Sequence, residues 1–233
     1  MGRYEARMSA DKLIVAIDTA DPVRAAAIAQ AVAPYCGLFK LGLEFFAANG
    51  PSGVRAIAGR PIFLDLKLHD IPNTVAGAVR AVMPLRPRML TLHAAGGAAM
   101  IGAAREAAED AGPQRPVLLA VTVLTSLDAA ALAATGVTDD PARQAVRLGR
   151  LAVAAGADGL VCSAHEIAAL RDALAGDVKL VVPGIRPAGS GAGDQARTMT
   201  PRAALDAGAD WIVVGRPITG AADPAAAAAG LFG

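Results

Sequence analysis

The chain has 233 residues, of which 54% are hydrophobic and 3% aromatic, and its formal net charge is +1. A charge so close to zero, with so few aromatic side chains, argues against a protein that binds nucleic acid or an anionic membrane surface. No apolar run is long enough to span a membrane, and residues 1–12 lack the apolar core of a signal peptide, so we expect a cytoplasmic protein.

Short runs rich in leucine and β-branched residues recur along the chain, and we predict a strand at each of them. Most are apolar throughout rather than alternating, which is typical of parallel strands buried on both faces. Alanine-rich segments with helical periodicity lie between them, for example 22–32, 73–83, 98–111 and 141–155. The predicted strands are 13–18, 38–42, 62–66, 89–93, 117–123, 159–162, 180–183 and 211–215.

This alternation predicts a (β/α)8 TIM barrel, because eight strand–helix units fit a chain of this length. A doubly wound open sheet is the alternative, although no GxGxxG turn follows the first strand. No linker or shift in composition divides the chain, so we expect a single catalytic domain over residues 1–233. The segment 187–201 is long and rich in small side chains, which indicates either a disordered loop or a functional lid.

Charged residues gather where the predicted third strand ends, in the sequence DLKLHD at 65–70. The chain has only four lysines, yet Lys40 and Lys67 lie inside apolar strands, where an unpaired charge is costly. Asp65 and Asp70 flank Lys67, and side chains two apart on a strand share a face. With Lys40 reaching Asp65 from the neighbouring strand, we expect an alternating array of lysines and aspartates.

Two interpretations of this array are open. It is either a structural network of ion pairs, or a site in which carboxylates hold a lysine ready to deliver a proton. Active sites of TIM barrels lie at the C-terminal ends of the strands. The position of Lys67 therefore favours the second interpretation.

A phosphate site is predicted after the seventh and eighth strands, where this fold commonly binds phosphate. The sequences VPGIRP (182–187) and VVGRP (213–217) end these strands. Gly215 would let the backbone approach a ligand closely, and Arg216 can make paired hydrogen bonds to a phosphate. Gln195, in the expected lid, could add a further donor.

Eight segments of the chain carry a resemblance to one known family. They are VAIDTAD (15–21), FKLGLEFF (39–46), FLDLKLHDIPNT (63–74), AVTVLTS (120–126), DGLVCSAHE (158–166), VVPGIRP (181–187), GDQARTMTP (193–201) and IVVGRPIT (212–219). Together they resemble the orotidine 5′-phosphate decarboxylases of the bacterial type. The resemblance implies a homodimeric barrel that converts orotidine 5′-phosphate to uridine 5′-phosphate and CO2 in pyrimidine biosynthesis, with neither a metal nor another cofactor.

The same resemblance implies a role for each charged residue. Lys67 would protonate C6 of the pyrimidine as CO2 leaves, and Asp65 would lie beside the carboxylate of the substrate. Lys40 would contact Asp65 and the ribose. Asp70 would enter the active site of the partner subunit, so that the dimer shares its sites.

Further residues are implied as contacts of the substrate. Asp18 would bind the ribose hydroxyls, and Ile71 and Thr74 would lie close to Asp70. The pyrimidine would meet Thr125 and Ser126. The phosphate would be held by Gln195, Gly215 and Arg216, with Arg186 helping to close the phosphate loop.

Two other functions are kept as alternatives. Magnesium-dependent sugar-phosphate decarboxylases and aldolases of the same superfamily have a similar DxKxxD pattern, although the IPNT, LTS and GDQ segments argue against them. A non-catalytic sensor of nucleotide phosphates is the other alternative, although phosphate binding alone does not require buried lysines. His93 has no second histidine at metal-binding spacing, and we expect a hydrogen-bonded structural role for it.

Overall fold

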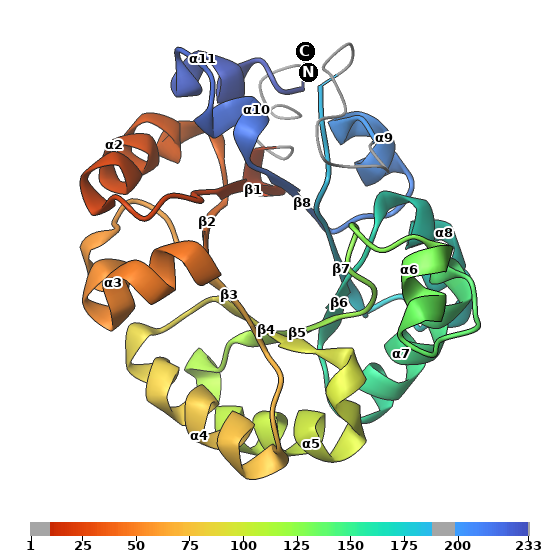
Figure 1. Cartoon of the computed structure of the whole chain (residues 1–233). Helices are drawn as coiled ribbons and strands as arrows, with labels where there is room; N and C mark the ends of the chain where they lie inside the picture. Colours follow the sequence, from red (N-terminus) through yellow and green to blue (C-terminus); the bar gives the residue numbers. More distant parts are fainter. Residues whose placement is uncertain (1–9, 188–198, 233) are drawn as a thin grey trace.

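The computed structural model describes residues 10–187 and 199–232. These residues form a closed barrel of eight parallel strands in sequential order, with the helices around it (Figure 1). The predicted TIM barrel is confirmed, and the doubly wound alternative is wrong. The strands are β1 (Leu13–Ala16), β2 (Leu38–Gly42), β3 (Ile62–Leu68), β4 (Met89–His93), β5 (Val117–Val121), β6 (Gly159–Val161), β7 (Lys179–Val182) and β8 (Trp211–Val214).

Helices connect the strands on the outside of the barrel (Figure 1). Three of them begin at an Asp-Pro pair, whose aspartate accepts hydrogen bonds from backbone N–H groups of the first turn: Asp21, Asp140 and Asp223. Proline is favoured just after such a cap because it has no N–H to satisfy. The helices are α2 (Pro22–Val32), α3 (Leu43–Ala56), α4 (Pro72–Val82), α5 (Gly97–Glu109), α6 (Ala129–Ala134), α7 (Pro141–Ala154), α8 (Ile167–Ala173), α9 (Pro201–Asp206), α10 (Arg216–Thr219) and α11 (Pro224–Ala229).

The inside of the barrel changes from apolar to polar along the strands. Inside the barrel, on the N-terminal side of the mouth, lies a buried apolar cluster: Ile14, Ala16, Leu38, Phe63, Met89, Leu119, Val181 and Val213. Two residues further along four of these strands come Asp18, Lys40, Asp65 and Thr91. Since strand residues two apart share a face, the same alternation that fills the core places polar side chains at the C-terminal mouth.

Ion pairs lie at the opposite, N-terminal end of the strands. Asp158, just before β6, accepts a hydrogen bond from Leu118 N and pairs with Arg115 at 2.6 Å. Asp210, just before β8, accepts from Leu180 N and pairs with Arg171 at 2.6 Å. Charged residues at this end of a TIM barrel generally serve stability rather than catalysis. In the part of the chain that the structure describes, no helix has the length and apolar character needed to cross a membrane.

Candidate active site

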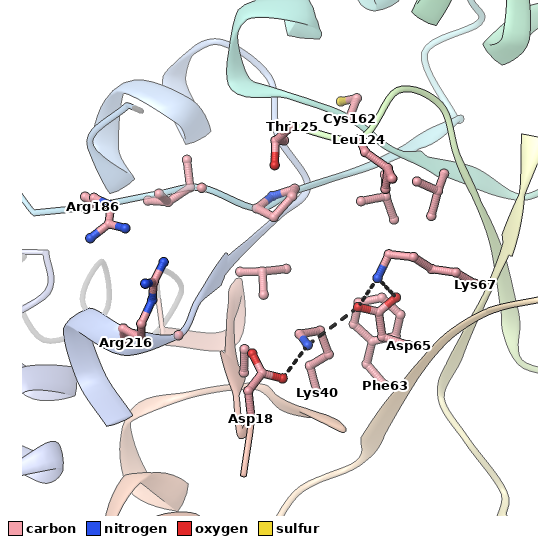
Figure 2. A pocket seen from close by; sticks show the side chains of 18 of the residues that line it. Asp18, Lys40, Phe63, Asp65, Lys67, Leu124, Thr125, Cys162, Arg186 and Arg216 are labelled. Atoms are coloured by element: carbon pink, nitrogen blue, oxygen red, sulfur yellow. Dashed lines mark hydrogen bonds and ion pairs between the residues drawn. The ribbon is translucent and has the colours of Figure 1, made fainter. Parts of the chain in front are cut away.

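A cavity of about 270 Å³ opens at the C-terminal mouth of the barrel (Figure 2). Its walls come from the ends of all the strands except β4, and its floor is the apolar layer that contains Ala16, Phe63 and Val213. The charged and hydroxyl side chains that line it are Asp18, Lys40, Asp65, Lys67, Thr125, Arg186 and Arg216.

Four of these side chains form a continuous charged array, drawn with dashed lines in Figure 2. Asp18 Oδ1 lies 3.0 Å from Lys40 Nζ, and Lys40 Nζ lies 3.5 Å from Asp65 Oδ2. Lys67 Nζ lies 2.9 Å from both carboxylate oxygens of Asp65. The array therefore runs Asp18–Lys40–Asp65–Lys67. Asp18 extends it beyond Lys40, whereas Asp70, expected on the far side of Lys67, does not line the cavity.

The environment of Asp65 favours its ionised form. Burial by itself would raise the pKa of this carboxyl, because a charge is poorly solvated in the interior. The ammonium groups of Lys40 and Lys67, with hydrogen bonds from Lys67 and Thr91, outweigh the burial and hold the pKa of Asp65 below its usual value. Asp65 thus stays a carboxylate at neutral pH, flanked by two cations.

The backbone at Lys67 departs from a regular strand. Lys67 has a φ of 49°, in the left-handed region, and the register of β3 against β4 shifts between Leu64 and Leu68. The prediction that Asp65 and Lys67 meet is confirmed, but they meet across a β-bulge rather than along a regular strand. A bulge re-aims a side chain, and bulges are frequent beside active sites.

Sequence reasoning missed two residues that shape this array. Thr91 Oγ1 donates to Asp65 Oδ1 at 2.9 Å and accepts from Lys67 N at 2.8 Å. Gly42 leaves room for the array, since a Cβ at this position would lie 3.1 Å from Lys40 Nζ. Thr91 is a polar residue inside the apolar strand 89–93, which could have marked it as part of the site. Threonine is so common in strands, however, that its presence there is not decisive.

Two arginines stand at the other end of the cavity. In Figure 2 the guanidinium groups of Arg186 and Arg216 lie near each other, away from the lysines. Gly215 lines the cavity beside Arg216, and a Cβ there would make only ordinary contacts of 3.5 Å or more with protein atoms. The space that a side chain at 215 would occupy is therefore open, and it is available to a ligand.

The remaining predicted site residues have different positions. Thr125 lines the cavity, whereas Ser126 is exposed and does not. Asp70, Ile71 and Thr74 are exposed where the chain leaves β3 for α4, outside the cavity lining. Asp70 Oδ1 accepts a hydrogen bond from Ile71 N at 2.7 Å. Gln195 and most of the expected lid lie outside the described residues.

Two histidines stack beside the bulge. The rings of His69 and His93 are 5.3 Å apart at an interplanar angle of 26°. Nδ1 of His93 is buried and has no hydrogen-bond partner among the described residues. Burial, with the nearby His69 and Lys67, lowers the pKa of His93, so the ring is neutral at pH 7. Among residues 10–187 and 199–232, no three His, Cys, Asp or Glu side chains form a group suited to a metal ion.

This arrangement combines two chemical capacities in one cavity. One end presents an ammonium group held by an ionised carboxylate, which can donate a proton or stabilise a developing anion. The other end presents guanidinium groups, which bind phosphate or carboxylate through paired hydrogen bonds. A phosphorylated substrate whose reacting atom develops negative charge would use both ends.

Comparison with known proteins agrees with this arrangement. Residues 11–231 match the model of the orotidine 5′-phosphate decarboxylase / HUMPS family. The orotidine 5′-phosphate decarboxylase of Gluconobacter oxydans is 58% identical over 221 residues, covering 93% of this chain and 94% of its own. That of Anaeromyxobacter sp. strain K is 58% identical over 220 residues, covering 94% of this chain and 95% of its own.

Solved structures show the same likeness. The crystal structure of orotidine 5′-phosphate decarboxylase from Lactobacillus acidophilus superposes with a TM-score of 0.82 at 36% identity, covering 94% of this chain and 96% of that chain. An uncharacterized conserved protein from Geobacillus kaustophilus superposes with a TM-score of 0.81 at 34% identity, covering 94% of this chain and 98% of that chain. The chain therefore belongs to the orotidine 5′-phosphate decarboxylase / HUMPS family.

Proposed function

We propose that this chain decarboxylates orotidine 5′-phosphate to uridine 5′-phosphate and CO2 in pyrimidine biosynthesis, with neither a metal nor another cofactor. The observation that carries the proposal is the ammonium group of Lys67, held 2.9 Å from the ionised Asp65 inside a cavity whose other end is lined by Arg186 and Arg216. Relatives that are 58% identical over nearly the whole chain bear the name of this activity. They support the same substrate here.

Lys67 would deliver the proton. Loss of CO2 from C6 leaves an electron pair in the plane of the pyrimidine ring, where the π-system does not absorb it, so a cation must stabilise the developing charge. An ammonium group has three N–H donors, and Asp65 accepts from Lys67 through both of its oxygens. A donor of Lys67 is left for C6, and proton transfer to C6 completes the reaction.

Asp65 would act in two ways in this mechanism. It fixes the position of Lys67, which is the larger contribution we assign to it. It also places a negative charge near the carboxylate of the substrate, and that repulsion is relieved as CO2 departs. Lys40, which bridges Asp18 and Asp65, would hold the ribose hydroxyls together with Asp18.

The phosphate would be bound far from the bond that breaks. Arg216, Gly215 and Arg186 would hold it, with Gln195 as a further donor, while Thr125 and Ser126 would meet the pyrimidine. Binding energy from a remote group can be used to position and desolvate the reacting end of a substrate. A substrate without its phosphate would therefore lose rate as well as affinity.

The charge of the array favours this function over a magnesium-dependent one. The name of the family joins two groups of proteins, so membership alone does not choose between them. Asp65 has Lys67 at 2.9 Å and Lys40 at 3.5 Å, and two ammonium groups beside one carboxylate oppose the approach of a divalent cation. Both lysines are used directly by decarboxylation, whereas a phosphate sensor would need neither.

We also infer that the enzyme is a cytoplasmic homodimer with shared active sites, built from one catalytic domain per chain. Asp70 and Thr74 are exposed beside the mouth of the barrel, and Ile71 is 66% exposed, as expected of residues that a partner subunit would cover. Eight strands of one barrel span most of the chain, which supports a single domain. Cys36 and Cys162 are free, as is usual in a reducing compartment.

A turnover assay tests this function directly. The purified chain is incubated with orotidine 5′-phosphate, with and without EDTA, and the uridine 5′-phosphate and CO2 are measured. We expect equal amounts of the two products and no effect of EDTA. Activity that EDTA abolishes and Mg²⁺ restores would favour the magnesium-dependent alternative, and tight binding without release of CO2 would favour the sensor.

A further inference from the structure

The bulge in β3 places three residues of that strand opposite a single residue of β4. Leu64 of β3 pairs with Leu90 of β4, and Leu68 pairs with Leu92, so residues 65–67 all lie opposite Thr91. The bulge contains both members of the Asp65–Lys67 pair. Whatever fixes its shape therefore fixes the separation and direction of these two side chains.

The hydroxyl group of Thr91 bonds to both ends of the bulge. It donates to Asp65 Oδ1 at 2.9 Å and accepts from the backbone N–H of Lys67 at 2.8 Å. The direction of each bond is set by its partner, because a carboxylate can only accept and a backbone N–H can only donate. Thr91 is fully buried, so water does not compete for either bond.

The backbone of Lys67 needs such a support. Its φ of 49° is uncommon for a residue that carries a Cβ, and a conformation of this kind persists only where the surroundings hold it. The bond from Lys67 N to Thr91 acts at this residue, where the ladder between β3 and β4 is interrupted. Without that bond the N–H would be buried with no acceptor, or the bulge would change its shape.

We propose that Thr91 is a positioning residue of the reaction, which acts through Lys67 and Asp65 without contacting the substrate. Its single hydroxyl group fixes the conformation of the bulge and so aims the ammonium group of Lys67 into the cavity. This inference rests on the proposed function, because it assigns Thr91 a part in the proton transfer by Lys67. It adds to the site a residue that holds Asp65 and Lys67 in place through hydrogen bonds.

Thr122 offers a matched comparison within the same barrel. It is also a buried threonine, directly after β5, and its hydroxyl group donates to Val161 O at 3.1 Å. That bond joins β5 to β6 and involves no member of the charged array. Removing the hydroxyl group of Thr122 would affect packing and stability, whereas removing that of Thr91 would also affect the direction of Lys67.

The experiment replaces each threonine by valine, which has nearly the same shape and no hydroxyl group. For Thr91→Val we expect kcat to fall by about 10- to 100-fold, the loss typical of a misplaced catalytic group, with KM and the affinity for uridine 5′-phosphate changed by no more than about threefold. Thr91→Ser keeps the hydroxyl group and should retain kcat. Thr122→Val should retain kcat even where it lowers the melting temperature.

Two results would overturn the inference. A folded Thr91→Val with kcat within about twofold of wild type would do so, and so would a loss in Thr91→Val that Thr122→Val matches. Should Thr91→Val fail to fold, Thr91→Cys decides by the same readout, because a thiol is only a weak donor and acceptor. A wild-type chain that releases no CO2 would contradict the proposed function itself, whereas normal wild-type turnover with an unimpaired Thr91→Val contradicts this inference alone.

Discussion

Lys67 Nζ lies 2.9 Å from both carboxylate oxygens of Asp65, two residues earlier in the chain. The contact depends on a left-handed residue in a bulged strand. It holds the lysine in one direction and keeps the aspartate ionised. A lysine on a flexible stem would otherwise sample many positions, so this contact is the preorganisation on which the proposed reaction depends.

Asp65→Asn should abolish turnover and also destabilise the fold. The substitution leaves the buried Lys40 and the partly exposed Lys67 close together without their shared anion. We expect the free energy of unfolding to fall by about 3 kcal/mol, the lower end of the cost of breaking a buried pair, because Lys67 is partly solvated. Urea denaturation at neutral pH measures this.

The difference in unfolding free energy between wild type and Asp65→Asn should also depend on pH. The folded pKa of Asp65 is lowered from 3.8, so its contribution to stability is fully present above that pH and is lost as the pH falls through the folded pKa. The difference in stability between wild type and Asp65→Asn should therefore narrow in acid. A difference that grows as the pH falls would contradict the assignment of Asp65 as a carboxylate held by two lysines.

Arg216→Ala should weaken binding of the phosphate specifically. Loss of a charge-assisted hydrogen bond costs about 1.5–3 kcal/mol, so we expect the affinity for uridine 5′-phosphate to fall by about 10- to 150-fold. The affinity for uridine, which lacks the phosphate, should not change. Isothermal titration with both ligands measures this, with Arg202→Ala as the control because Arg202 is 74% exposed on α9 and pairs with Asp206. Equal losses for both ligands would place Arg216 outside the phosphate site.

Two inactive variants should restore activity in one heterodimer if Asp70 acts in the partner's site. A dimer of one Lys67→Ala chain and one Asp70→Asn chain would contain one native site and one doubly altered site. Carrying different affinity tags, the two chains can be co-expressed and the heterodimer isolated. We expect about half of the wild-type turnover per dimer, since half of its sites are native. A heterodimer no more active than either homodimer would assign Asp70 to its own chain.

The sequence predicted the barrel well because its signal repeats. Eight apolar runs separated by helical segments leave few other architectures, and the helix 22–32 was predicted with the bounds of α2 (Pro22–Val32). Errors in the predicted ranges were confined to the ends of strands and helices. The strands predicted at 13–18 and 117–123 end at Ala16 and Val121. The apolar pattern continues past the last residues that pair in register with a neighbouring strand, although Ile17 N and Thr122 N still donate to Lys40 O and Val161 O.

The site was predictable in its members and less so in its geometry. Scarce lysines in apolar strands pointed to Lys40 and Lys67, since an unpaired buried charge is costly. Nothing in the local sequence indicated that Lys67 would adopt a left-handed conformation, because that depends on Thr91 in another strand. Asp18 was missed as a partner of Lys40 for the same reason, since the contact joins residues that are 22 apart.

The most direct test of this account is the turnover of Lys67→Ala with orotidine 5′-phosphate. The control is Lys179→Ala, because Lys179 lies at the start of β7, at the opposite end of the barrel, where it pairs with Asp210 at 3.5 Å. We expect Lys67→Ala to lose at least about a thousandfold in kcat, the upper range of what a proton donor and charge stabiliser supplies, while its fold and its affinity for uridine 5′-phosphate persist. Lys179→Ala should keep its activity. Turnover of Lys67→Ala close to that of the wild type would contradict the assignment of Lys67 as the proton donor.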